Sequence, residues 1–210
     1  MSIHLGIIPD GNRRWCKHNN KTELEYIHTI QNMIKNIFEN NDKYPILKLI
    51  SEISIYVLSK DNVIKRDHKT INLIEKIIDF LCIILSTNEY YIKINIIGDM
   101  TILPSTIQEK LEVLTNISLF ELKKQFTINL AIGYDPVKDT KKYLKEGYET
   151  RNQIDMVLRS GGEKRSSGFF PLQTLYSEWI YLDTLWPDIT ITHIHDSILE
   201  FQSRRRNFGK

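Results

Sequence analysis

The sequence predicts a single α/β domain in which helices flank a mostly parallel central sheet, and three observations lead to that prediction. Short apolar runs alternate along the chain with longer segments of helical periodicity, as in folds where strands and helices follow one another. The 210 residues are enough for one sizeable core and too few for two comfortable ones. Because no internal repeat, low-complexity tract or Gly/Ser-rich linker interrupts the pattern, we expect residues 1–210 to form one domain.

Each element follows from local patterning. Five apolar runs predict the strands, at 4–8, 53–58, 92–97, 126–132 and 156–158. Thr22 and Glu25 have the spacing of a capping box, and the apolar positions after them predict a helix over 22–40. A second helix is expected over 67–85, a third from Ser105, directly after Pro104, and a last one over 192–202.

Composition and charge exclude several classes of protein. Hydrophobic residues make up 41% and charged residues 26% of the chain, which is typical of globular domains. The net charge of +2 does not favour nucleic-acid binding. Two cysteines cannot build a disulfide framework, and charged residues interrupt the most apolar stretch, at 71–85. We therefore expect a soluble, cytoplasmic protein.

The first loop that suggests chemistry follows the strand at 4–8. It contains Asp10 and Gly11 and is followed by Arg13 and Arg14. A glycine loop that leads into a helix can bind phosphate, and the arginines add charged donors. A carboxylate repels a bare phosphate but suits one that is bound together with Mg²⁺. An ordinary turn before a solvated basic helix explains this segment equally well.

A second loop follows the strand at 156–158. Arg159 and Arg165, several hydroxyls and the pair Gly161-Gly162 suit a diphosphate, through guanidinium hydrogen bonds and close backbone approach. A solvated Gly/Ser loop is the alternative. In parallel α/β sheets ligands bind beyond the carboxyl ends of the strands, so two such loops suggest two phosphorylated substrates.

At this point the sequence resembles a known family, the cis-prenyltransferases, which include undecaprenyl and dehydrodolichyl diphosphate synthases. The opening segment 4–15 is similar to the family's first signature, and 59–62 resembles its Ser-x-Glu-Asn segment. Further along the chain, 159–167, 176–178, 185–188 and 201–209 resemble its C-terminal signatures in the same order. The resemblance implies the family's fold, with an apolar tunnel for the growing chain.

The resemblance also implies roles for individual residues. Asp10 and Asn62 match catalytic residues, the latter assisting proton removal from isopentenyl diphosphate, and Asp10 and Glu178 match magnesium ligands. The residues that match substrate-binding positions are Gly11, Asn12, Arg13, Arg14, Trp15, His28, Ser59, Lys60, Asp61, Lys65, Arg66, Arg159, Arg165, Ser166, Ser167 and Gly209.

The implied reaction is the extension of an allylic diphosphate, such as farnesyl or geranyl diphosphate, with isopentenyl diphosphate. Mg²⁺ is the implied cofactor. The implied assembly is a homodimer in which the arginine-rich end, with Gly209, reaches the partner's site. Peripheral association with membranes through the lipid product is expected. A nucleic-acid partner is not expected.

The sequence departs from the family pattern at several places. Leu24 stands where the family has an arginine before His28, and Asp135-Pro136-Val137 replaces a Gly-Gly-Arg run. The segment between 134 and 155 is shorter than usual. Together with the bulk of Val57, Tyr56 and Phe80, this predicts a narrow tunnel and a short- or medium-chain product.

Two other functions remain as alternatives. A non-catalytic partner subunit of a heteromeric cis-prenyltransferase shares the fold but lacks much of the two loops, both of which stand here. A phosphate-binding regulatory module leaves Asp10 and Asn62 without a role. A further pattern, His193 and His195, suggests a metal site less than it suggests the start of a surface helix, because no third ligand is evident.

Overall fold

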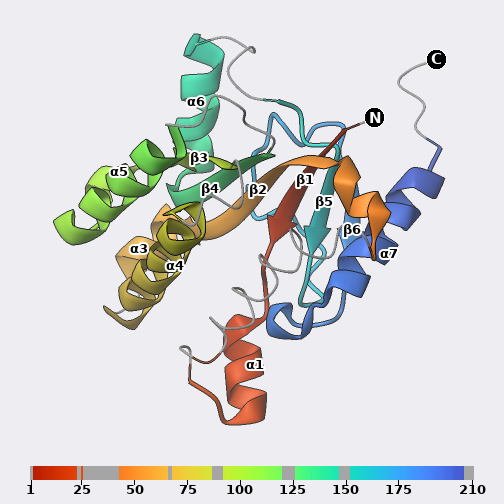
Figure 1. Cartoon of the computed structure of the whole chain (residues 1–210), viewed down its shortest axis with the longest axis horizontal. Helices are drawn as coiled ribbons and strands as arrows, with labels where there is room; N and C mark the ends of the chain where they lie inside the picture. Colours follow the sequence, from red (N-terminus) through yellow and green to blue (C-terminus); the bar gives the residue numbers. More distant parts are fainter. Residues whose placement is uncertain are drawn as a thin grey trace.

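The computed structural model describes residues 2–22, 25, 43–65, 68–86, 92–119, 126–146 and 152–205. Its centre is a six-stranded sheet of order β3-β4-β2-β1-β5-β6 in which every pairing is parallel (Figure 1). The strands are β1 (Ile3–Ile8), β2 (Ile50–Ser59), β3 (Ile92–Ile97), β4 (Phe126–Tyr134), β5 (Met156–Arg159) and β6 (Glu178–Tyr181). The structure confirms the fold class and the five predicted strands.

Strand β6 was not predicted. It has four residues, Glu178–Tyr181, and only Ile180 among them is buried, so neither its length nor its pattern separates it from a loop. It forms one edge of the sheet, beside β5.

The described helices include those predicted over 67–85, from Ser105 and over 192–202, whereas α3 (Lys60–Lys65) was not predicted. They are α1 (Asn12–Asn19), α3 (Lys60–Lys65), α4 (His68–Ser86), α5 (Ser105–Leu119), α6 (Pro136–Glu146) and α7 (Ile191–Ser203), with short 3-10 turns η1 (Pro45–Leu49), η2 (Met100–Ile102) and η4 (Trp186–Asp188). α6 was not predicted, because only Asp139 and Tyr143 of its residues are buried and no apolar stripe marks it. The helix predicted over 22–40 lies largely outside the described residues.

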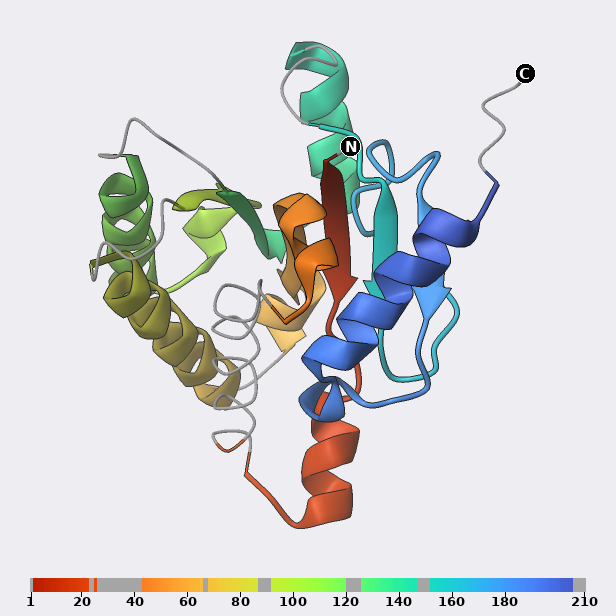
Figure 2. The same ribbon diagram turned by 45° about the vertical axis from the view of Figure 1, so that its right-hand side comes forward.

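Two groups of helices cover one face of the sheet. α4 and α5 pack on β2, β4 and β3 through a cluster that includes Ile78, Leu111 and Leu130. α7 and η1 pack on β1 and β5 through a second cluster, which includes Leu5 and Ile198. Figure 2 shows α7 running beside β1 and β5, with α4 and α5 to its left, toward the β3 edge of the same sheet.

The second face of the sheet is partly polar. Nε2 of His4 lies 2.8 Å from the Ser54 hydroxyl, which accepts from Nδ2 of Asn129 at 3.0 Å. Asn129 in turn accepts from Nδ2 of Asn95 at 2.8 Å. These hydrogen bonds join side chains of β1, β2, β4 and β3 in one row, because alternate residues of neighbouring strands share a face.

The carboxyl ends of the strands meet at one edge of the sheet, and α1 extends beyond that edge (Figure 1). The two loops singled out in the sequence follow β1 and β5, which are neighbours. The sheet therefore brings them together, as the sequence predicted. Within the described part of the chain, no helix combines the length and apolar character needed to cross a bilayer.

Candidate active site

Gly11 shapes the loop between β1 and α1. Its φ of +103° lies in the left-handed region, which glycine adopts readily and other residues rarely reach. A Cβ on Gly11 would also lie only 2.8 Å from Cδ2 of Leu185. The turn lets α1 begin at Asn12, and the N–H groups of a first helical turn favour an anion.

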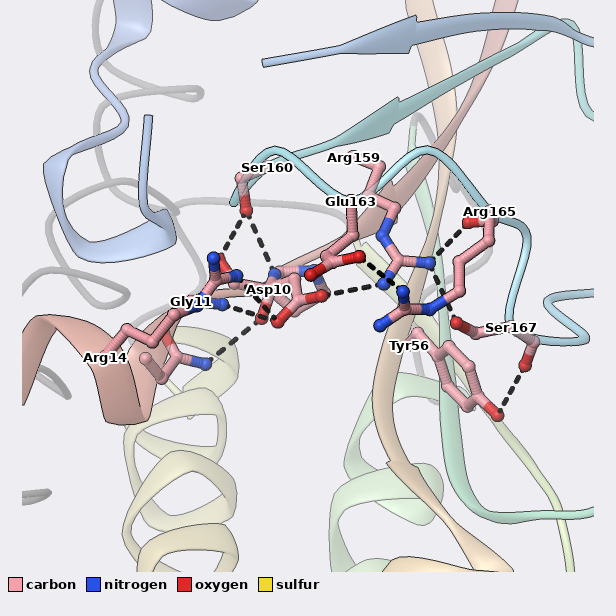
Figure 3. A network of polar contacts seen from close by, with 11 residues as sticks. Asp10, Gly11, Arg14, Tyr56, Arg159, Ser160, Glu163, Arg165 and Ser167 are labelled. Carbon is pink, nitrogen blue, oxygen red and sulfur yellow. Dashed lines mark hydrogen bonds and ion pairs between the residues drawn. The ribbon is translucent and has the colours of Figure 1, made fainter. Parts of the chain in front are cut away.

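Asp10 lies at the centre of a polar network that joins the two loops (Figure 3). Its Oδ2 accepts from Nη2 of Arg159 at 2.7 Å, and its Oδ1 lies 3.6 Å from Nη2 of Arg14. Oδ1 also accepts from the Gly11 N–H at 2.7 Å. The side chain remains 32% exposed, so the carboxylate is held by the protein and still open to a ligand.

Arg159 is the last residue of β5, and its side chain is only 3% exposed. Its Nη1 donates to the Ser167 hydroxyl at 2.8 Å and to the Arg165 carbonyl. Its Nε is buried without a hydrogen-bond partner among the described residues. Because a buried donor is costly to leave unpaired, this guanidinium suits an anion that enters from the cavity.

A cavity of about 400 Å³ lies between these loops and the end of β2. Its apolar part is lined by Ile8, Val57, Leu58 and Leu73. The residues of the sequence prediction that line it are Asp10, Gly11, Asn12, Arg13, Arg14, Ser59, Asn62, Arg159, Arg165 and Ser167. One pocket thus has both cationic and apolar side chains in its lining, which suits a diphosphate that carries a hydrocarbon chain.

Ser59 and Asn62 reach the cavity from the junction of β2 and α3. The Ser59 hydroxyl accepts from the Asn62 N–H at 3.2 Å, in the manner of a helix cap. This contact fixes the start of α3, from which Asn62 extends to the cavity.

Other predicted binding residues are described but do not line the cavity: Trp15, Lys60, Asp61, Lys65 and Ser166. Lys60 pairs with Asp135 at 3.2 Å, and Lys65 pairs with Asp61 at 3.1 Å. Nε1 of Trp15 donates to Asp188 at 2.7 Å, which ties α1 to η4. The predicted residues His28, Arg66 and Gly209 lie outside the described residues.

Glu178 is not brought to Asp10 within this chain. It is the first residue of β6 and pairs in register with Met156, whereas Arg159 pairs with Tyr181 at the opposite end. Three residues of strand separate the two levels by about 10 Å. Its carboxylate instead accepts from Nη1 of Arg204 at 2.9 Å.

Side chains at the site that were not among the predicted site residues include Ser160, Leu73 and Tyr56. Ser160 bonds to the backbone of Asp10, and Leu73 of α4 lines the apolar part of the cavity. The Tyr56 hydroxyl donates to the Ser167 carbonyl at 3.4 Å. Burial, helped by the charge of Asp61, raises the pKa of Tyr56, so its phenol remains a neutral donor. Ser160 had a sequence signal in its place directly after Arg159, and Tyr56 had been expected to narrow the tunnel.

The residues fit a magnesium ion that arrives with its substrate. Among the described residues, no group of three His, Cys, Asp or Glu side chains could hold a metal by itself. Mg²⁺ keeps several waters and binds through one or two carboxylates together with substrate phosphates. Asp10 offers one such carboxylate in a cavity that Arg13, Arg14 and Arg165 also line.

Comparison with known proteins agrees with this geometry. Residues 8–209 match a family model described as "Putative undecaprenyl diphosphate synthase". The chain is 32% identical to a tritrans,polycis-undecaprenyl-diphosphate synthase (geranylgeranyl-diphosphate specific) of Aeropyrum pernix, over 98% of this chain and 97% of that protein. It is 29% identical to an isoprenyl transferase of Prochlorococcus marinus, over 98% and 83% of the two chains.

Two solved structures of prenyl diphosphate synthases are also similar to this chain. Lavandulyl diphosphate synthase from Lavandula x intermedia, in complex with dimethylallyl diphosphate, is similar with a TM-score of 0.79 and 25% identity, over 99% of this chain and 98% of that one. A probable undecaprenyl diphosphate synthase from Campylobacter jejuni shares the fold, with a TM-score of 0.75, 24% identity and coverage of 100% and 99%.

Proposed function

The chain belongs to the undecaprenyl diphosphate synthase family of prenyltransferases, and from that membership we propose that its Asp10 cavity joins isopentenyl diphosphate to an allylic diphosphate such as farnesyl or geranyl diphosphate. Family membership makes the chain a cis-prenyltransferase that elongates isoprenoid chains. The observation that carries the proposal is the position of Asp10 between Arg14 of α1 and Arg159 at the end of β5. The family match also supports our expectation of one domain over residues 1–210.

The two loops bind different diphosphates in this proposal. Gly11 and the start of α1, with Arg13 and Arg14, hold the allylic diphosphate. Arg159, Arg165 and Ser167 hold isopentenyl diphosphate. The support is that both loops line one cavity and that guanidinium groups bind diphosphate oxygens in pairs.

The reaction breaks the C–O bond of the allylic diphosphate and forms a C–C bond to isopentenyl diphosphate, which then loses a proton. Arg14 and the first N–H groups of α1 stabilise the negative charge that develops on the departing diphosphate. Asn62, which lines the same cavity from α3, assists removal of the proton. The apolar residues Val57, Leu58 and Leu73 exclude water from the positive charge on carbon.

Mg²⁺ is the proposed cofactor. Asp10 would hold it together with the allylic diphosphate, and the ion would neutralise charge on the leaving group. Asp10 is suited to this role because its carboxylate is partly exposed to the cavity.

The apolar part of the cavity receives the growing chain, and we propose a short- or medium-chain product. Val57 and Leu73 line this part. Phe80 is partly buried and lies seven residues after Leu73 on α4, hence on the same side of that helix two turns further along. A tail that passes Leu73 along α4 would meet this bulky ring.

The proposed assembly is a homodimer. Large apolar side chains are exposed on α6 and on the loop before β6, a pattern typical of an interface. They are Val137, Leu144, Leu175 and Tyr176. We also propose that the enzyme associates peripherally with membranes through its lipid product, in the cytoplasm.

The alternative is a non-catalytic partner subunit. It predicts that the chain makes no product alone and only stimulates a catalytic chain. The cationic side chains around Asp10, namely Arg13, Arg14, Arg159 and Arg165, favour the enzyme, because a subunit without catalysis has no need of them.

Incubation of the purified protein with labelled isopentenyl diphosphate, Mg²⁺ and a panel of allylic diphosphates tests the proposal. Thin-layer chromatography of the products would report activity, primer preference and chain length together. Extension of at least one primer is the expected result. Failure with every primer, combined with stimulation of a catalytic prenyltransferase subunit, would establish the alternative.

A further inference from the structure

Ser160 is a buried polar residue to which the proposed reaction gives no role. It follows Arg159 at the end of β5, and it is 0% exposed. Its hydroxyl oxygen accepts from the Asp10 N–H at 3.0 Å, and the hydroxyl donates to the Asp10 carbonyl at 2.8 Å. Figure 3 shows both contacts, with the Asp10 carboxylate directed away from Ser160 toward Arg159 and Arg14.

These contacts lie just beyond the last paired residues of β1 and β5. The pairing of β1 with β5 ends at Ile8 and Arg159, two residues before Asp10. Beyond that point the Asp10 N–H reaches back to the Ile8 carbonyl at 3.0 Å, within a tight three-residue turn. The Ser160 hydroxyl adds a contact from the neighbouring loop.

Arg159 and Ser160 therefore contact different parts of Asp10, the side chain and the main chain. Arg159 binds the carboxylate of Asp10, and Ser160 binds its main chain on both sides of Cα. The Trp186 N–H also donates to the Asp10 carbonyl at 2.9 Å. The Ser160 hydroxyl thus ties the main chain of Asp10 to the loop after β5, in addition to the contact of Arg159 with the carboxylate.

We propose that Ser160 is a positioning residue that fixes the Asp10 carboxylate relative to the isopentenyl diphosphate loop. The inference rests on the proposed function of Asp10. Ser160 contacts no cavity surface, so its effect on turnover passes through Asp10. A displacement of about 1 Å at a reacting group can cost about a hundredfold in rate.

The test compares Ser160→Ala and Ser160→Cys with Ser160→Thr. Alanine and cysteine remove the strong hydroxyl contacts, and cysteine nearly keeps the volume; threonine retains the hydroxyl. The matched control is Ser197→Ala, which removes another buried hydroxyl, bonded to the His193 carbonyl at 2.7 Å in α7.

The expected result for Ser160→Ala and Ser160→Cys is a kcat at least about tenfold lower and a higher Mg²⁺ concentration for half-maximal rate. KM for isopentenyl diphosphate should change less than about threefold, because Arg159, Arg165 and Ser167 remain. Ser160→Thr, which keeps the hydroxyl, should have a higher kcat than Ser160→Ala and Ser160→Cys, and Ser197→Ala should behave as wild type. A folded Ser160→Cys protein with wild-type kcat and Mg²⁺ dependence would overturn the proposal.

Hydrogen–deuterium exchange of the peptide that contains residues 9–11 separates this proposal from the proposed function. Exchange there should be faster in Ser160→Ala and Ser160→Cys than in wild type, and unchanged in Ser197→Ala. This readout requires no catalysis, so it tests the contact even if Asp10→Asn proves fully active and the catalytic role of Asp10 fails. Unchanged exchange in every folded Ser160 variant would refute the positioning role.

Discussion

Replacing Asp10 by alanine should impair both activity and stability, for different reasons. Arg159 is 3% exposed, and the Asp10 carboxylate is its ion-pair partner at 2.7 Å. Removal of one partner from a fully buried pair costs about 3–5 kcal/mol. Because Asp10 is 32% exposed, solvent screens the pair and we expect about 2 kcal/mol.

In a domain of this size, about 2 kcal/mol corresponds to a fall in Tm of about 4–8 °C. Turnover should fall by about a hundredfold or more, since a lost transition-state contact of this kind is worth about 3 kcal/mol. Asp79→Ala serves as the control, because Asp79 is 51% exposed and pairs with Lys110 at the surface; it should change neither quantity appreciably.

Inorganic pyrophosphate provides a second test of the ion pair between Asp10 and Arg159. In Asp10→Ala the anion can take the place of the lost carboxylate beside Arg159, so pyrophosphate should raise Tm more than it does in wild type. Differential scanning fluorimetry with and without pyrophosphate measures this, and initial rates at saturating Mg²⁺ measure turnover. Equal Tm values for variant and wild type, with equal responses to pyrophosphate, would refute the ion-pair argument. Retention of most activity would refute the catalytic role.

Four further predictions concern the two diphosphate loops, His4, the C-terminal residues and the tunnel. Arg165→Ala should mainly raise KM for isopentenyl diphosphate and Arg14→Ala mainly that for the allylic primer; equal effects on both substrates would contradict two separate pockets. Burial lowers the pKa of His4 below its usual 6.5 against the opposing charge of Glu52, so its contribution to stability is complete above pH 6.5 and is lost as the pH falls below that value. Urea unfolding between pH 5 and 7 should show this with a slope of at most about 1.4 kcal/mol per pH unit, and an unchanged slope in His4→Gln would disprove it. Deletion of residues 206–210, which spares the pairing of Arg204 with Glu178 and Glu200, should lower activity but not Tm, whereas a fully active truncated protein would favour a solvated basic end. Val57→Ala and Phe80→Ala should lengthen the product on thin-layer chromatography, and a wild-type product of eleven or more isoprene units would show that the tunnel runs elsewhere.

The parallel sheet could be predicted because β1, β2, β3 and β4 are rich in Ile and Leu and are followed by helical or turn patterns. Burial in the core imposes such patterns on a sequence. β6 and α6 left weaker signals, because only Ile180 of β6 and only Asp139 and Tyr143 of α6 are buried. Edge strands and solvated helices need few apolar residues, so periodicity detects them poorly.

The candidate site could be predicted in part for a different reason. Asp10, Arg159 and Arg165 follow strand ends, and parallel topology places all strand ends at one edge. What the sequence could not give is the pairing within the site. That Arg159 is buried on Asp10, and that Lys60 faces Asp135 rather than the cavity, depends on side-chain directions that spacing does not encode.

Glu178 shows that similarity of a motif does not by itself predict where a side chain lies in the fold. Its segment resembles the family's signature, and the implied role was that of a second magnesium ligand beside Asp10. The register of β6 places Glu178 at the amino end of its strand, level with Met156, while Asp10 lies beyond the carboxyl end of β1. One chain cannot bring both carboxylates to one ion without dismantling the edge strand. If Glu178 binds the magnesium ion, it must do so in the site of a second copy, and its partner Arg204 must then release it. The metal assignment of Glu178 and the homodimer are therefore one hypothesis, and a monomeric enzyme with full activity would exclude both.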